Sequence, residues 1–187
     1  MSIKKEYLDK LQNKIGEKRY NHSIRVFKKA MEINDALRLN IDDKKLEQAA
    51  IFHDCAKYNE IYYYDKLKVK YNIDKKIMSN MAVSHSFLAE FVAQEEYNIK
   101  DKDVLDAIKY HTTGTENMRK LTKVILLADA IEDAREYDGV NVLRKISKED
   151  LDKAVLMYFD HTILFLITKK APIHPETIKA RNFLLRG

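Results

Sequence analysis

The sequence predicts an almost entirely α-helical protein, and two observations carry that prediction. Only 4 Gly and 2 Pro occur among the 187 residues, so few positions interrupt a helix. Apolar residues also recur at three- and four-residue spacings over long stretches, which is the period of an amphipathic helix. The chain contains no internal repeat, low-complexity tract or linker, so we expect one domain over residues 1–187. The expected fold class is therefore all-α, a single helical bundle.

In the first part of the chain, helices are expected at about residues 4–15, 17–39 and 43–56, with Gly16 separating the first two. The segment 59–72, "NEIYYYDKLKVKYN", is the least helical stretch. We expect its three consecutive tyrosines in a loop packed on the core, with the lid of a pocket as the alternative.

The rest of the chain predicts helices at about residues 74–97, 101–112, 118–136, 147–169 and 175–185. Asp101 is a predicted N-cap and Gly114 a predicted stop, while Gly139 marks another break. Pro175 opens the last helix, where its missing N–H group costs nothing.

Composition excludes several classes of protein. Hydrophobic residues make up 45% and charged residues 34%, which is ordinary for a folded soluble chain. No apolar run approaches the roughly 18–20 residues that span a bilayer, and the N-terminus lacks an apolar signal core, so we expect a cytoplasmic protein with no membrane partner. A single cysteine, Cys55, agrees with a reducing compartment and is expected in the core. The net charge of +5 favours anionic ligands such as phosphates, but Lys and Arg are too scattered to predict nucleic-acid binding.

The stretch "AAIFHDCAKY" carries His53 and Asp54 directly behind apolar residues that should enter the core. A buried carboxylate is costly unless it is paired, hydrogen-bonded or bound to a metal. Asp129 poses the same problem within "VILLADAIEDA". Three histidines also lie on apolar helix faces: His22, His85 and His111. Each histidine alone could be a core residue bonded to a backbone carbonyl, but Asp129 needs a cation. A shared metal explains the whole set, and imidazole with carboxylate suits iron, manganese or zinc.

The order of His22, the His53-Asp54 pair and Asp129 resembles the H…HD…D pattern of the HD-domain metal-dependent phosphohydrolases, and His85 and His111 resemble its extended version. Six blocks are similar to those of the YqeK family of bacterial HD-domain proteins: "RYNHSIRV", "HDCAK", "AIKYHTTG", "LADAIEDAR", "GVNVLR" and "IHPETIKARN". This resemblance implies a single HD-domain helical bundle. It also implies a symmetrical bis(5′-nucleosyl)-tetraphosphatase, which splits the dinucleoside polyphosphate diadenosine tetraphosphate into two ADP.

The resemblance assigns the metal ligands as His22, His53, Asp54 and Asp129, and it favours iron over manganese or another divalent transition metal. His85 and His111 have two interpretations. They either bind a second ion, with Asp54 bridging the pair, or contact a substrate phosphate beside a single ion. We therefore expect one or two ions, with Asp54 and Lys57 as the catalytic residues.

Helical spacing adds candidates for phosphate binding. Lys57 follows Asp54 by three residues and His53 by four, so all three can share one helix face. Arg135 is expected on the same helix as Asp129, where its guanidinium could clamp phosphate oxygens. Arg19 precedes His22 by three residues and should face the same way. For each of the three, an exposed surface position is the alternative.

Three further features have two interpretations each, and His161 has one. Thr112 either donates its hydroxyl to phosphate or stabilises a turn. Glu132 either orients a ligand histidine or forms a surface ion pair. The resemblance suggests that the stretch Ile173-His174-Pro175 binds the nucleoside. The start of a helix would also explain these residues. His161 has no counterpart in the pattern and is expected to be structural.

Other functions compete with this one. An HD-domain site could equally serve a mononucleotide, a cyclic nucleotide or guanosine tetraphosphate. A non-enzymatic, metal-bound module that senses nucleotides is a third hypothesis, and an RNA-binding domain is disfavoured because basic and acidic residues alternate. The sequence leaves a homodimer open.

Overall fold

The computed structural model describes residues 2–186. Its helices, in chain order, are α1 (Lys5–Ala36), α2 (Asp43–Phe52), α3 (Glu60–Leu67), the short 3-10 helix η1 (Lys75–Ser79), α4 (Met81–Tyr97), α5 (Lys102–Tyr110), α6 (Lys120–Ile131), α7 (Val140–Ile146), α8 (Leu151–Thr168) and α9 (Pro175–Leu184). No β-strand occurs between residues 2 and 186, so the predicted all-α class is confirmed. None of these helices combines the length and the apolar character that crossing a membrane requires.

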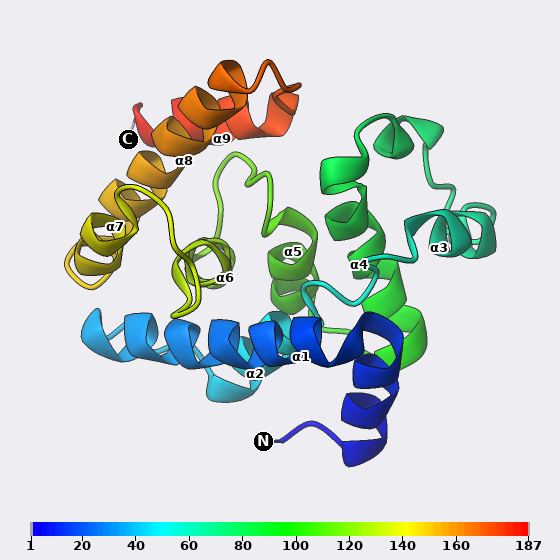
Figure 1. The fold of residues 1–187 in the computed structure, drawn as a ribbon. Helices are drawn as coiled ribbons and strands as arrows, with labels where there is room; N and C mark the ends of the chain where they lie inside the picture. The colour runs from blue at the N-terminus through cyan, green and yellow to red at the C-terminus, as the bar shows by residue number, and fades with distance from the viewer. Residues whose placement is uncertain (1, 187) are drawn as a thin grey trace.

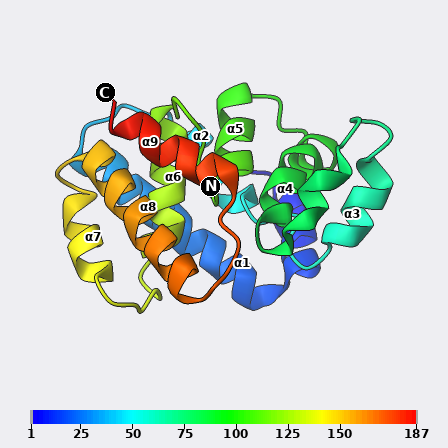
Figure 2. The same cartoon turned by 90° about the horizontal axis from the view of Figure 1, so that it is seen from above.

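Helix α6 is the centre of the bundle. It packs against α1 and α2 on one side, α5 on another, and α7 and α8 on a third. Figure 1 shows the long α1 running beneath α6 and α5, with α8 and α9 above them. Seen from above, α8 and α9 lie side by side at one end, and α3 and α4 form the other end (Figure 2). Nearly every residue of α6 from Leu121 to Ile131 is buried, as expected of a helix that is apolar all round.

Several sequence predictions are confirmed. Gly16 sits at a kink inside α1, with φ 78° and ψ 159°, where the sequence placed a break between two helices. Asp101 caps α5 by accepting hydrogen bonds from the backbone N–H groups of the second and third residues after it. Pro175 is the first residue of α9. Cys55 is buried in the core, as its single occurrence suggested.

The loop predicted over residues 59–72 is wrong, because α3 occupies much of it. Tyr63 and Leu67 are four residues apart and both buried, so the aromatic run supplies the inner face of a short helix that packs on α4. The single helix predicted over 74–97 is also wrong. Asn80 adopts an extended conformation, with φ −130° and ψ 90°, and its side chain caps α4 instead of continuing η1.

Helices α2 and α6 end well before the predicted residues 56 and 136, and α7 was missed. α2 stops at Phe52, so His53 and Asp54 lie in the turns that follow it. α6 stops at Ile131, because Glu132 turns to an extended ψ of 159° and its carboxylate accepts a hydrogen bond from the N–H of Ala134. The helix α7 occupies residues that the sequence assigned to a break. These early ends matter, because they place site residues on turns rather than on helix faces.

We expect Gly114→Ala to destabilise the protein by roughly 2–5 kcal/mol. Gly114 ends the turn that carries His111, with φ 64°, and a Cβ there would lie 2.5 Å from Phe159 Cζ. The left-handed backbone costs an L-residue about 1–2 kcal/mol, and overpacking adds about 1–3 kcal/mol. Denaturant unfolding measures the difference. Gly139→Ala is the matched control, because φ is 87° there and no atom lies within 4 Å of the added Cβ. Equal losses in the two variants would contradict the steric argument.

Candidate metal centre

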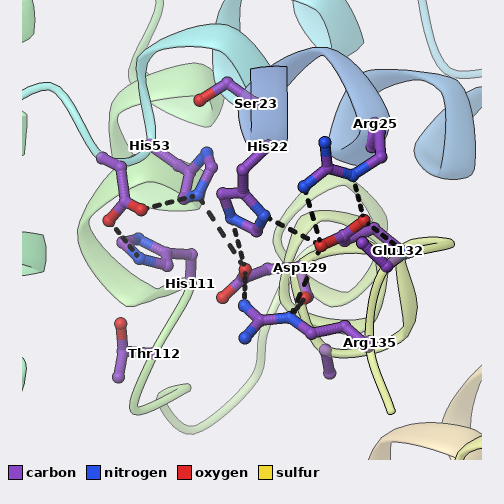
Figure 3. A network of polar contacts seen from close by, with 12 residues as sticks. His22, Ser23, Arg25, His53, His111, Thr112, Asp129, Glu132 and Arg135 are labelled. Atoms are coloured by element: carbon purple, nitrogen blue, oxygen red, sulfur yellow. Dashed lines mark hydrogen bonds and ion pairs between the residues drawn. The ribbon is translucent and has the colours of Figure 1, made fainter. Parts of the chain in front are cut away.

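Four separate segments bring imidazoles and carboxylates together beside α6. His22 comes from α1, His53 from the turn after α2, His111 from the turn after α5, and Asp129 from α6 itself (Figure 3). His22 Nε2 lies 3.0 Å from Asp129 Oδ1, and His53 Nε2 lies 4.0 Å from the same oxygen. One ligand atom from each of His22, His53 and Asp129 lies within 4.8 Å of the other two, and the same holds for His53, Asp54 and His111. The fold therefore brings these residues close together, as the sequence predicted.

Three of the histidines share one arrangement of their ring nitrogens. The Nδ1 atoms of His53 and His111 each lie 2.7 Å from the backbone carbonyl three residues earlier. A carbonyl can only accept, so each Nδ1 carries the proton and each Nε2 presents a lone pair. His22 repeats the arrangement, with Nδ1 3.2 Å from the Glu132 carboxylate. A histidine held in this way is typical of metal ligation, because the outer partner fixes both tautomer and ring orientation.

Two of these Nε2 atoms lack a hydrogen-bond partner. His22 Nε2 and His53 Nε2 are buried and unsatisfied, although both face the Asp129 carboxylate. Buried polar atoms are nearly always satisfied, so two orphaned lone pairs aimed at one place need an explanation. A divalent transition metal fits this donor set, because neutral imidazole nitrogens and carboxylate oxygens are its usual ligands.

The electrostatics of the cluster also favour a cation. Burial alone would raise the pKa of Asp129, but His22, His53 and Arg135 lower it, so the carboxylate stays ionised. Burial alone would lower the pKa of His53, but the Asp54 carboxylate raises it above the ordinary value. The carboxylates of Asp54 and Asp129 thus favour a positive charge at His53 Nε2. A metal ion could supply that charge in place of a proton.

The two carboxylate oxygens of Asp54 face different neighbours. Oδ2 lies 2.9 Å from Arg19 Nη1 and 3.3 Å from His53 Nε2. Oδ1 lies 3.3 Å from His85 Nε2 and 3.7 Å from His111 Nε2. Asp54 therefore joins the His22–Asp129 side of the cluster to the His85 side, and Arg19 faces the cluster as its spacing from His22 predicted.

His85 differs from the other three histidines. Its two ring nitrogens lie 3.1 Å and 3.3 Å from Lys57 Nζ, and Thr112 Oγ1 lies 3.5 Å from its Nε2. Burial first, and the neighbouring His111 second, lower the pKa of His85 to about 3, so it is neutral at pH 7. His85 thus shares its surroundings with an ammonium and a hydroxyl, which are groups that bind phosphate. Lys57 reaches this position from the turn after α2, so the prediction that it shares one helix face with His53 and Asp54 is wrong.

Arg135 lies beside Asp129, away from Thr112 (Figure 3). Its Nη2 lies 2.6 Å from Asp129 Oδ1, and its Nε donates to the Asp129 carbonyl at 2.8 Å. The prediction that Arg135 lies on the same helix as Asp129 is wrong, since α6 has already ended. The turn at Glu132 folds the chain back, and this turn places the guanidinium against the carboxylate.

The sequence interpretation missed two residues next to the centre. Arg25 donates from Nε to Glu132 Oε2 at 2.5 Å, and its position three residues after His22 on α1 could have revealed it. Tyr58 is 64% exposed with φ 69°, and Arg19 lies over its ring at 5.9 Å. No sequence signal marks Tyr58. Together with Lys18 and Arg135 these residues line a hollow of about 270 Å³ in which positive charge predominates.

The segment before α9 lies apart from the metal cluster. The side chain of His174 accepts a hydrogen bond from the backbone N–H of Glu176, and its ring lies 5.1 Å from that of Phe87. Ile173 and Pro175 flank it, and in residues 2–186 none of the three forms a hydrogen bond or ion pair with the cluster. The contacts of this stretch are those of a helix start, because His174 caps α9 through the backbone N–H of Glu176. His161, expected to be structural, is exposed on α8 with its ring 5.1 Å from that of Tyr137.

Glu132→Gln is expected to weaken metal binding roughly 10- to 100-fold, which is the usual effect of losing a partner that orients a metal ligand. Glu132 is buried and joins His22 to Arg25, and the hydrogen bond with Arg25 lowers its pKa to about 2 against the effect of burial. Metal retained after dialysis against a graded series of chelator concentrations measures the change. Glu136→Gln is the control, because Glu136 is exposed on the following loop. Unchanged retention in Glu132→Gln would show that His22 needs no such partner.

Comparison with known proteins identifies a family, similar sequences and a similar solved structure. A family model described as the HD domain matches residues 19–134. A Bacillus subtilis protein named "Bis(5'-nucleosyl)-tetraphosphatase, symmetrical" is 35% identical over 185 residues, which cover 98% of each chain. A Halalkalibacterium halodurans protein of the same name is 38% identical over 177 residues, 91% of each chain. The crystal structure of a predicted HD superfamily hydrolase involved in NAD metabolism, from Clostridium acetobutylicum, is 39% identical, with a TM-score of 0.88 over 97% of this chain and 96% of that chain.

Proposed function

The chain belongs to the YqeK family of HD-domain phosphohydrolases, and we propose that it hydrolyses diadenosine tetraphosphate symmetrically into two molecules of ADP. The observation that carries the proposal is the cluster itself. Metal donors with unsatisfied lone pairs lie directly beside cationic side chains that are not needed to hold a metal. The relatives that carry the activity in their names match nearly the whole chain rather than the HD pattern alone.

In this proposal His22, His53, Asp54 and Asp129 hold a divalent metal ion, and the family resemblance favours iron. His111 presents its Nε2 lone pair in the same way as His53, so we assign it to the metal side as well. A bound divalent ion lowers the pKa of a coordinated water toward about 7 and polarises a phosphoryl oxygen. The chain thus needs no serine or cysteine nucleophile.

The remaining side chains position the polyphosphate. Arg135 and Arg19 would hold phosphate oxygens on the Asp129 side of the centre, each already held in place by a carboxylate. Lys57, His85 and Thr112 would hold the phosphate on the other side. Phosphoryl transfer depends mainly on positioning and charge neutralisation, so cations on both flanks of the attacked phosphorus suit the reaction. We propose that the Lys57 ammonium stabilises the negative charge that develops on the departing ADP.

One nucleoside would lie near the start of α9. His174 is half-buried against Phe87, and Ile173 and Pro175 fix the backbone on either side of it. Thr115 donates to Glu176 at 3.2 Å and so ties the loop after His111 to this segment. We therefore treat residues 1–187 as one HD domain, in which the segment after the matched residues 19–134 completes the substrate site. We propose the cytoplasm as its location, where Cys55 stays reduced.

The test is product analysis with diadenosine tetraphosphate. The protein is purified without chelators, its metal content is measured, and it is incubated with the dinucleotide plus iron or manganese. Chromatography should then show ADP as the only product. AMP together with ATP would show that an outer P–O–P bond breaks and would contradict the proposal. No turnover of the dinucleotide, with turnover of a mononucleotide or guanosine tetraphosphate instead, would assign the site to another nucleotide.

A further inference from the structure

A cleft begins at the metal centre, where Asp129 and Arg135 line it, and extends along α8. Its volume is about 370 Å³, within the range of roughly 300–1,000 Å³ that small-molecule sites occupy. Asp129 and Arg135 form its inner end, and α8 forms its far wall. Arg135 lies beside Asp129 and away from Thr112 (Figure 3), and Lys57, His85 and Thr112 do not line this cleft.

Aromatic rings dominate the walls of this cleft. Tyr137, Tyr158, His161 and Phe165 all line it. The Tyr137 hydroxyl donates to the carbonyl of Ala130 at 3.0 Å, which fixes its ring, and the His161 ring lies 5.1 Å away at 45°. Phe165 is 53% exposed, so its ring is not buried in the core and can contact a ligand. Flat rings held in place beside an open volume are suited to stacking with a nucleobase.

The proposed reaction requires such a place. Symmetrical cleavage puts a central phosphate at the metal, so the two nucleosides of the substrate must extend from it in two directions. We propose that the cleft lined by Tyr137, His161 and Phe165 binds the second nucleoside of the dinucleotide, with Arg135 holding the phosphate that leads into it. This inference rests on the proposed function. It adds the residues by which the enzyme would prefer a substrate with two nucleosides.

The cationic hollow around Lys18 and Arg25 is the other candidate for this role. It shares Arg135 with the cleft, but half of its lining residues carry guanidinium or ammonium groups. Those groups match phosphate rather than a base, and Arg19, Arg25 and Arg135 already pair with carboxylates. Four ring-bearing residues line the aromatic cleft, whereas the hollow is lined by the Tyr58 ring and by His22, which is assigned to the metal.

The experiment compares two substrates in the metal-loaded, full-length protein. Diadenosine tetraphosphate has two nucleoside ends, and adenosine 5′-tetraphosphate has one. Phe165→Ala and His161→Ala should each raise KM for the dinucleotide roughly tenfold, because a stacked base is lost. KM for adenosine 5′-tetraphosphate should stay unchanged, since its single nucleoside binds near His174. Phe165→Tyr keeps an aromatic ring and should restore the wild-type KM.

Leu164→Ala is the matched control, because Leu164 is 65% exposed on the same helix and does not line the cleft. It should leave both substrates unaffected. An equal rise of KM for both substrates in Phe165→Ala, or no change for either, would overturn the assignment of the cleft while leaving the proposed hydrolase intact. A wild-type protein that is loaded with metal and cleaves neither substrate would overturn the proposed function, and the second nucleoside site with it.

Discussion

Asp54→Ala is expected to lower kcat/KM at least about a thousandfold and to release the bound metal, while leaving the helical content intact. Asp54 is 3% exposed, and its two oxygens face Arg19 and His53 on one side and His85 and His111 on the other. Its removal deprives the centre of the carboxylate that links both sides. Metal catalysis supplies several kcal/mol of transition-state stabilisation, which corresponds to about three or more powers of ten in rate.

The measurements for this variant are metal content, steady-state kinetics and far-ultraviolet circular dichroism. Asp65→Ala is the control, because Asp65 is an exposed carboxylate on α3 whose ion-pair partner is the neighbouring Lys68. It should match the wild type in all three measurements. Full activity in Asp54→Ala would refute the assignment of this cluster as the reaction centre.

His85→Ala and His111→Ala should lose activity for different reasons. We expect His85→Ala to keep its metal and to lose roughly 10²–10³ in kcat, which is the usual cost of removing one group that stabilises the transition state. His85 lies among Lys57 and Thr112, and no backbone carbonyl fixes its tautomer. His111→Ala should bind metal more than about tenfold more weakly, because His111 aims a lone pair at the centre as His53 does.

These two variants control for each other. Both residues are buried histidines, and their ring centroids lie 5.3 Å apart. Metal content after dialysis, measured beside kcat for each variant, separates the two roles. Equal loss of metal in both variants would instead favour a second ion held by His85, His111 and Asp54. Metal retained in both would assign His111 to the phosphate.

The helical period of the apolar residues and the free-energy cost of burying a carboxylate were enough to predict much of the cluster. α6 is apolar all round, so a carboxylate at Asp129 had to be explained by a cation, and the structure places His22 and His53 against it. The kink at Gly16 and the caps of α5 and α9 were also predictable, because each depends on the chemistry of one or two neighbouring residues.

Features that depend on tertiary contacts were not predictable in the same way. The end of α6 is set by Glu132, whose carboxylate reaches Arg25 on α1 and the N–H of Ala134 instead of continuing the helix. Nothing in the local pattern reveals a partner that lies 107 residues away. The same turn places Arg135 beside Asp129, so the predicted position of Arg135 near the cluster is found, although the helix predicted to carry it ends earlier. The aromatic cleft required the fold, because its walls come from α8 and from the loop after α6.

The most direct test of the account is hydrolysis of diadenosine tetraphosphate in ¹⁸O-labelled water, followed by mass spectrometry of the nucleotides. The account predicts ADP alone, with one labelled molecule for each unlabelled one, and the label on the terminal phosphate. That result requires water to attack an inner phosphorus and the bond between the two central phosphates to break. Labelled AMP or labelled ATP would contradict it, because an outer P–O–P bond would then have broken instead of the central one.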